Sequence, residues 1–501
     1  MEKKRKRATW PLFFTIQKNF NRIRVEVKRF SDSIPVRNLF LGIIFFLGLM
    51  FAFSNEAHPI YPQGEFKTDS YHQFWFLYQS EKREGQKEFI FRPFYSRYSE
   101  SISGYSYTTS LYPVYAKQET PHWAKWSFLF IFDGNYVKHP DYGEDRDTTF
   151  GPFYRSGKGD TDRENYTAIF PFYGKIKSAF SWSEVGFVLW PIYTYWSHKD
   201  FKAHSVLWPF TVYGKGLVRK EYRIFPFYSY KSHTGKYRRS SILWPFYQSG
   251  EMNLDKKEPY SYRLYFPFYG YKSSLYGNMK SYTLLYLPFA LFAYGYDKRV
   301  NSVEYRFLFG FFQFGRSNDK DYHKLIFFPF YGYSHFASKE STFITPFYFR
   351  MKSDTYHMKS DYLFLVPFYI RSLKHYIKED RRENYYKLWP LFRYHKDSEG
   401  NLFWNTLTLF PIKSIHLERI WDPIFSIVEY SKYINGEKRL SLLVRLYTQR
   451  WSKEEFHLYI PLLLDFSIKE ENKNWEVLYG LIGYERKGEG KKFKLFWFLE
   501  L

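Results

Sequence analysis

The sequence contains no cysteine among its 501 residues. A disulfide scaffold, a thiolate zinc site and an iron–sulfur cluster are therefore excluded, as is a cysteine-linked lipid anchor. Proline (24) and glycine (28) are used about as often as in ordinary proteins. This usage excludes a collagen-like chain and a disordered chain rich in proline or glycine.

The sequence also lacks the short motifs of common enzymes and ligand sites. Its 14 histidines are scattered and form no His-Glu-x-x-His arrangement, and no Gly-x-Ser-x-Gly elbow is present. Acidic residues within 141–147 and 160–164 are interspersed with basic ones, which favours self-paired, solvated loops over a calcium site. We therefore expect no catalytic residue, no metal site, no cofactor and no enzymatic activity.

Aromatic residues are abundant instead and make up 24% of the chain, mainly as Tyr (50) and Phe (56). Both residue types favour β-strands. So much apolar surface can be buried that a disordered chain is not expected.

The formal net charge is +24. Residues 1–37 hold eleven Lys or Arg and three acidic residues, so 11 − 3 = +8 lies in this segment. The rest is spread over predicted turns, where it indicates solvated loops or contact with an anionic surface such as phospholipid headgroups or lipopolysaccharide. Aromatic and basic residues also alternate as in single-strand binders, but the N-terminal segment argues against nucleic acid as a partner.

One long hydrophobic run lies near the N-terminus, from Leu39 to Phe53. Its 15 residues are short for a membrane span of about 20 and suit the apolar core of a signal peptide. The preceding basic region (residues 1–37) is longer than a signal peptide allows, so residues 38–54 are predicted as a signal peptide or an uncleaved signal-anchor. A buried core helix is a third reading. Both export readings place the repeat domain, residues 58–501, outside the cytoplasm.

The repeat domain is built from units of about 20 residues, each centred on an aromatic-Pro-aromatic core such as Leu243-Trp244-Pro245-Phe246-Tyr247. About 22 to 24 such units can be counted. Four units place Trp directly before Pro, and this regular position favours structural packing over a carbohydrate platform. The residues assigned to the structural repeat core are Pro171, Trp190, Pro191, Trp208, Pro209, Pro226, Trp244, Pro245, Pro267, Pro288, Pro329, Pro367, Trp389 and Pro390.

Each unit predicts one β-strand, with Pro near its middle and a polar turn at its end. Turns such as Asn435-Gly436 and Gly277-Asn278 suit tight hairpins, and short links imply antiparallel neighbours. The predicted fold class is all-β: an antiparallel up-and-down meander of about 22 strands, closed as a large barrel because closure removes exposed edges.

The export segment, the many strands and the Tyr residues at both strand ends together resemble bacterial outer-membrane β-barrel proteins, at the level of architecture only. The nine residues from Tyr222 to Tyr230 would span roughly 30 Å, or about 23 Å in height when tilted. The resemblance implies an outer-membrane envelope protein with a channel, transport or structural role. Its partners would be membrane lipid or lipopolysaccharide, with envelope proteins or glycans as further candidates.

Three observations oppose a porin-like barrel. Proline in mid-strand cannot donate to the ladder. In residues 242–247 both faces of the predicted strand are apolar, and the chain ends on Leu501 instead of an aromatic residue. The alternatives are a non-spanning periplasmic or surface repeat protein that binds partners or glycans, and a membrane-bound enzyme.

Overall fold

The computed structural model describes residues 68–500, except residues 84, 140–142, 162–163, 178–181, 287–289 and 319–320. The predicted basic region (1–37) and signal segment (38–54) lie outside the described residues. The described chain is an antiparallel β-meander in which each strand pairs with the next one along the sequence. The predicted all-β antiparallel meander is thus confirmed.

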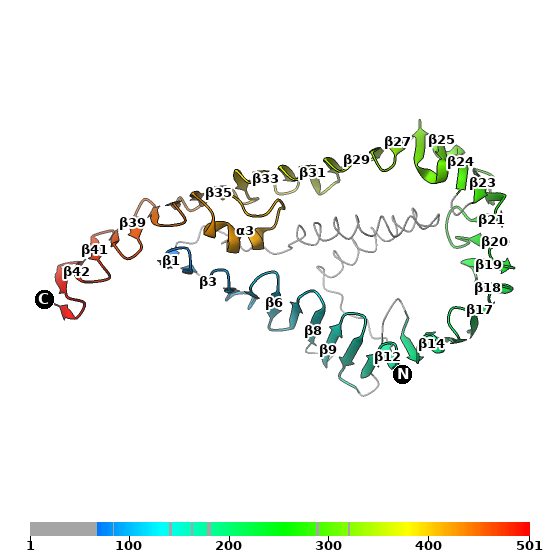
Figure 1. Ribbon diagram of the computed structural model, residues 1–501, viewed down its shortest axis with the longest axis horizontal. Coiled ribbons are helices and arrows are strands. Elements are labelled where there is room, and N and C mark those ends of the chain that lie inside the picture. Colours follow the sequence, from blue (N-terminus) through cyan, green and yellow to red (C-terminus); the bar gives the residue numbers. More distant parts are fainter. Residues whose placement is uncertain are drawn as a thin grey trace.

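The sheet bends back on itself, so that two arms of strands face each other across the bend (Figure 1). The first arm holds the N-terminal strands. Its strands are β1 (Thr68–Phe74), β2 (Tyr78–Arg83), β3 (Gln86–Phe91), β4 (Tyr95–Glu100), β5 (Ser106–Ser110), β6 (Tyr115–Thr120), β7 (Trp123–Phe128), β8 (Phe132–His139), β9 (Gly143–Phe150), β10 (Tyr154–Lys158), β11 (Tyr166–Ile169) and β12 (Tyr173–Lys177).

The middle of the chain forms the curve of the bend (Figure 1). Its strands are β13 (Glu184–Val188), β14 (Tyr193–His198), β15 (Phe201–Val206), β16 (Thr211–Lys215), β17 (Arg219–Ile224), β18 (Tyr228–His233), β19 (Tyr237–Ile242), β20 (Tyr247–Met252), β21 (Tyr260–Tyr265), β22 (Tyr269–Ser274), β23 (Met279–Tyr286), β24 (Ala290–Asp297), β25 (Ser302–Phe307) and β26 (Phe312–Ser317). Two 3-10 turns, η1 (Lys298–Val300) and η2 (Leu308–Gly310), flank β25.

The second arm holds the C-terminal strands and extends beyond β1 at its free end (Figure 1). Its strands are β27 (Tyr322–Phe327), β28 (Tyr331–Phe336), β29 (Lys339–Ile344), β30 (Tyr348–Asp354), β31 (Met358–Leu365), β32 (Tyr369–Tyr376), β33 (Arg381–Leu388), β34 (Phe392–Lys396), β35 (Leu402–Thr406), β36 (Val428–Lys432), β37 (Lys438–Leu442), β38 (Tyr447–Trp451), β39 (Glu455–Ile460), β40 (Leu464–Lys469), β41 (Asn472–Val477), β42 (Ile482–Lys487), β43 (Gly490–Leu495) and β44 (Leu499–Glu500).

The one α-helix among the described residues lies between β35 and β36. Helix α3 (Ile415–Trp421) continues into a 3-10 turn, η3 (Asp422–Ile424). The hydroxyl of Ser414 caps α3 by accepting the backbone N–H of Leu417 at 3.4 Å. Among the described residues, no helix is both long and apolar enough to cross a membrane.

The aromatic-Pro-aromatic cores form turns, and the prediction that they lie in mid-strand is wrong. Leu243–Phe246 connects β19 to β20, and Phe225–Phe227 connects β17 to β18. The peptide bond before Pro is cis in these turns, including Trp244-Pro245. Because Pro has no N–H to donate, a turn suits it better than the middle of a ladder.

Each repeat of about 20 residues therefore supplies two strands, and the prediction of one strand per repeat is wrong. The described chain has 44 strands, about twice the predicted number. Strands β1 to β43 are four to eight residues long. Aromatic turns and polar turns alternate along the chain, so the aromatic turns form one edge of the sheet and the polar turns form the opposite edge.

Hydrogen bonds do not close the sheet. Within the described residues, no backbone pairing joins β44 or another C-terminal strand to β1, so the predicted barrel is not confirmed. The two arms are connected instead by side chains, described below.

The two faces of the sheet differ in character. The inner face lines the concave side of the bend and carries many polar, charged and small residues, such as Glu221 and Arg223 of β17. Buried apolar clusters lie between them on the same face, as at Trp196, Ala203 and Val212. The outer face carries mainly aromatic and aliphatic side chains, such as Tyr222 and Ile224 of the same strand. The two apolar faces expected from residues 242–247 arise because residues 243–246 form a turn, whereas the strands on either side alternate in polarity.

Candidate functional site

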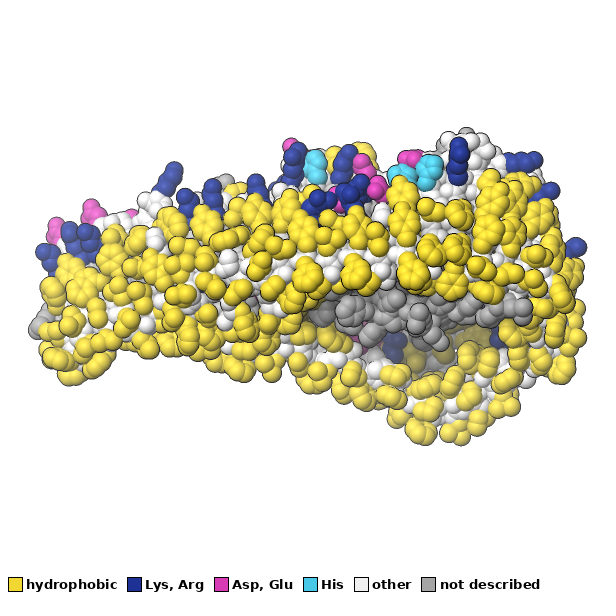
Figure 2. Space-filling model, turned by 45° about the horizontal axis from the view of Figure 1, so that its top comes forward, with side chains coloured by type: hydrophobic (Ala, Val, Ile, Leu, Met, Phe, Trp, Pro, Cys, Tyr) yellow, Lys and Arg dark blue, Asp and Glu magenta, His cyan; other side chains and the backbone are white. Residues whose placement is uncertain are grey.

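The edge formed by the aromatic-Pro-aromatic turns, termed the aromatic rim, is a continuous row of exposed apolar side chains. Phe227, Trp244 and Phe246 are 61%, 47% and 59% exposed. A folded soluble protein rarely leaves so many large apolar side chains contiguous and uncovered. In Figure 2 hydrophobic side chains cover the visible face down to its lower edge.

Backbone hydrogen bonds connect successive turns along the aromatic rim. The N–H of Trp208 donates to the carbonyl of Pro191 at 2.7 Å, and the N–H of Trp244 donates to the carbonyl of Pro226 at 2.6 Å. Neighbouring rings also contact one another, with centroids 5.7 Å apart for Trp190 and Trp208. The aromatic rim is therefore an ordered surface, because its backbone groups are paired within the rim itself.

The structure places the predicted repeat-core residues on this rim. The prolines at 171, 191, 209, 226, 245, 267, 329, 367 and 390 lie in turns between paired strands. The same turns contain the four tryptophans that directly precede proline, namely Trp190, Trp208, Trp244 and Trp389. Pro288 lies outside the described residues.

Aromatic side chains continue from the rim onto the outer face. Tyr213, Tyr222 and Tyr230 of three successive strands lie side by side, with ring centroids 5.4 Å and 6.3 Å apart. A similar row follows at Tyr282, Tyr294 and Tyr305. Cross-strand aromatic pairs of this kind stabilise the sheet and leave one side of each ring outside.

The opposite edge, termed the charged rim, consists of the polar turns. In Figure 2 Lys, Arg, Asp and Glu side chains gather along one edge of the molecule. Some of them pair with each other: Arg299 lies 3.0 Å from Glu258. Such exposed pairs add little stability, so the charged rim is chiefly a solvated surface.

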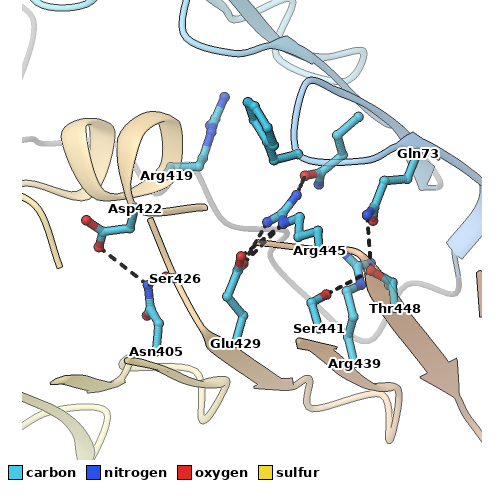
Figure 3. A network of polar contacts seen from close by, with 12 residues as sticks. Gln73, Asn405, Arg419, Asp422, Ser426, Glu429, Arg439, Ser441, Arg445 and Thr448 are labelled. Carbon is cyan, nitrogen blue, oxygen red and sulfur yellow. Dashed lines mark hydrogen bonds and ion pairs between the residues drawn. The ribbon is translucent and has the colours of Figure 1, made fainter. Parts of the chain in front are cut away.

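A polar cluster, termed the arm junction, connects the two arms where β1 and β2 face β36–β38 (Figure 3). The Gln79 side-chain oxygen accepts hydrogen bonds from Arg92 and from Arg445, each at 2.7 Å. Arg445 also pairs with Glu429 at 2.8 Å. Gln73 donates to the Thr448 hydroxyl at 3.1 Å, again from one arm to the other.

A second part of the arm junction is ionic and fully buried. Glu81 accepts from Arg439 at 3.3 Å, and Arg83 lies 3.8 Å from Glu437. Burial by itself raises the pKa of Glu81, but the guanidinium groups of Arg439 and Arg83 outweigh burial and lower this pKa to about 2. Glu81 is therefore charged in the folded protein, and the pairs connect strands far apart in sequence.

Helix α3 adds a third set of contacts. Its Glu418 accepts from Lys387 at 2.7 Å and from Arg393 at 2.6 Å, and it also accepts from the Tyr385 hydroxyl. Burial raises the pKa of Glu418, yet Lys387 and Arg393 outweigh it and lower the pKa to about 2. With three donors on one carboxylate, these residues hold α3 against β33 and β34.

The other side of α3 contacts the N-terminal arm. The Trp421 indole N–H donates to the carbonyl of Tyr112 at 3.0 Å, and Arg419 pairs with Glu88 at 3.0 Å. The rings of Tyr107 and His416 lie 4.3 Å apart. Helix α3 thus contacts both arms and ties them together.

The arm junction was not predicted from the sequence. Its residues come from positions more than 300 apart, and no local motif marks them. A weak signal for the arm junction lies in the proline-poor C-terminal repeats, since buried arginines need partners and these repeats contain Arg439, Arg445 and Arg450. Among the described residues, no cluster of three or more His, Asp or Glu side chains could hold a metal ion.

Comparison with known proteins adds no family assignment. No protein-family model matches the chain, and no curated protein matches it.

Proposed function

We propose that this chain is an exported envelope protein that sits in one leaflet of a membrane, with its aromatic rim and outer face in lipid and its charged rim at the headgroups. The observation that carries the proposal is the joint exposure of rim and outer face, opposite a polar inner face. Burying large apolar side chains in lipid is favourable, whereas the charged groups of the opposite rim stay with water and headgroups. The role is structural or lipid-handling, without catalysis.

Strand length supports insertion into a single leaflet. A strand of six residues such as β17 is about 20 Å long at 3.3 Å per residue. A tilt of about 40° reduces its height to about 15 Å, roughly half of the 30 Å hydrocarbon core. Strands that cross a bilayer need about 9–11 residues. The Tyr222–Tyr230 span that suggested a full crossing runs through a turn, so both ends lie at similar heights.

Flotation with vesicles of phosphatidylcholine tests the proposal, because this neutral lipid removes a purely electrostatic attraction. Wild-type protein should float with the vesicles. The double variant Trp244→Ser/Phe246→Ser should float about tenfold less or worse, since each large side chain moved into lipid contributes about 1.5–3 kcal/mol. The matched control Lys236→Ser changes the charged rim and should float like wild type. Wild-type protein left wholly in the aqueous fraction would exclude the proposal.

A closed outer-membrane barrel that spans the bilayer is the second candidate. The alternation of outward apolar and inward polar residues favours it, because spanning barrels share this pattern. A planar-bilayer measurement separates the two candidates. A one-leaflet protein gives no steady conductance, whereas large, steady steps would favour the spanning barrel.

A further inference from the structure

A pocket on the inner face of the curve lies between β17 and β21. Its volume is about 340 Å³. One part of its lining comes from charged inner-face residues, namely Glu221, Arg223, Lys231 and Arg239. The other part comes from the aromatic rim and includes Pro226 and Trp244. The pocket, termed the inner pocket, is thus polar on one side and apolar on the other.

Cations outnumber the single carboxylate in the inner pocket. Glu221 is 3% exposed and pairs with Lys231 at 2.8 Å and with Arg223 at 3.5 Å. Arg219 approaches the same carboxylate at 3.9 Å. Arg239 is exposed, and its guanidinium lies 6.0 Å from the Tyr237 ring. One negative charge therefore faces four positive ones.

The register of the sheet brings two of these cations together. Lys231 of β18 lies directly opposite Arg239 of β19 on the inner face. Like charges in directly opposed positions destabilise a sheet, and a bound anion beside them would relieve the repulsion. Ser229 and Ser241, also opposed and 2.7 Å apart through their hydroxyls, add hydrogen-bonding groups on the same face. The arrangement is suited to an anionic group with several oxygen acceptors.

The apolar side of the pocket continues directly into the rim. Arg223 donates to the carbonyl of Pro209 at 3.4 Å, so its guanidinium reaches the base of a rim turn. The rings of Phe225 and Trp244 lie 5.3 Å apart in the two adjacent turns. A ligand held by Arg223 could therefore place an attached hydrocarbon chain against these rings.

We propose that the inner pocket binds an anionic phospholipid, with its phosphate among Arg223, Lys231 and Arg239 and its acyl chains along Phe225 and Trp244. Arginine and lysine favour phosphate oxygens through charge-assisted hydrogen bonds. The inference deepens the proposed function, on which it rests, by naming the lipid class. It assigns the inner face a role in holding the headgroup of a lipid whose tail follows the rim.

The test uses the full chain in detergent and short-chain lipids that are soluble as monomers. Binding of dioctanoyl phosphatidic acid is measured by calorimetry, with dioctanoyl phosphatidylcholine and inorganic phosphate as comparisons. Phosphatidic acid should bind at least about tenfold more tightly than either. The variant Arg223→Gln/Arg239→Gln should lose about tenfold or more in affinity for phosphatidic acid, while Arg238→Gln, on the outer face of the same strand, should bind like wild type.

Equal binding of inorganic phosphate and phosphatidic acid would overturn the lipid assignment and leave only an anion site. Equal binding by the double variant and wild type would overturn the assignment of the lipid site to this pocket. The thermal unfolding midpoint of each variant shows whether it is folded, and Arg239→Gln alone changes an exposed residue. Wild-type protein that floats with vesicles but does not bind phosphatidic acid refutes this inference alone. Wild-type protein that binds phosphatidic acid but does not float refutes the proposed function.

Discussion

Arg445 donates a hydrogen bond of 2.7 Å to the side-chain oxygen of Gln79, a residue 366 positions earlier in the chain. The contact joins β2 to the turn between β37 and β38, two segments with no backbone pairing to each other. Contacts of this kind, and not a closing ladder, hold the two arms together. The shape of the molecule therefore depends on a few buried polar side chains.

Removing Arg445 should separate the arms. In Arg445→Met the carboxylate of Glu429 stays buried without its main partner, and breaking a buried pair this way costs about 3–5 kcal/mol. A lowered unfolding midpoint and a longer distance between spin labels on β2 and β38 would show the effect. The control Arg238→Gln removes an exposed pair with Glu251 at 3.4 Å and should cost less than about 1 kcal/mol. An unchanged label distance in Arg445→Met would contradict the prediction.

Acid should also open the arm junction. The pKa of Glu81 is lowered from 4.5 to about 2 in the folded protein. The stabilisation that ionised Glu81 contributes is fully present above pH 4.5. It is lost as the pH falls from about 4.5 towards 2, since protons then bind the unfolded chain first. Near-ultraviolet circular dichroism against pH measures the loss. Glu81→Gln should be less stable at pH 7 and should lose less on acidification, and a slope equal to wild type would contradict this assignment.

The absence of cysteine makes the depth of each rim directly measurable. Single nitroxide labels are introduced as Phe246→Cys on the aromatic rim and Lys236→Cys on the charged rim. In vesicles, the label at 246 should be accessible to oxygen and shielded from a water-soluble nickel reagent, and the label at 236 should show the reverse. The physical reason is that oxygen partitions into the apolar lipid core while the polar reagent stays in water. Equal accessibility at the two positions would contradict one-leaflet insertion.

Gly174 should tolerate no larger residue. A Cβ at this position would lie 2.4 Å from the Cα of Ala168 on the paired strand, and a backbone atom cannot easily move. Gly174→Ala is expected to destabilise the protein by about 1–3 kcal/mol through overpacking. Gly295→Ala is the matched control, because its Cβ would meet ordinary contacts beginning at 3.5 Å. It should be neutral or slightly stabilising, since alanine costs less conformational entropy than glycine in a strand. Thermal unfolding midpoints compare the two.

Parts of the architecture could be predicted because they are local. The repeat of aromatic-Pro-aromatic cores, the all-β class and the antiparallel order follow from residue types and short links. The strand count could not be read correctly, because the apolar core around Trp244 and Pro245 looks like a strand centre when it is read alone. Its true position is a turn, where the proline needs no N–H partner and the rings lie exposed.

The residues of the candidate site also fall into two groups, those that the sequence pointed to and those that it did not. The rim residues, such as Trp190 and Trp208, were singled out from the sequence, although they were expected in the interior of strands. The residues of the arm junction, such as Gln79 and Arg445, could not be found, because their partners lie hundreds of positions away. The charged residues of the inner pocket looked like ordinary strand residues until the register placed Lys231 opposite Arg239.

The repeat, the strand-forming composition and the absence of thiol chemistry can all be read from the amino-acid sequence, since each depends on residue type and close spacing. The rim that each turn joins, the face that each strand residue takes and the contact between the arms depend on the folded chain. The physical reason is that a period-two strand assigns its faces only when its register with a neighbour is fixed. The bend of the sheet then brings together side chains that no local pattern relates.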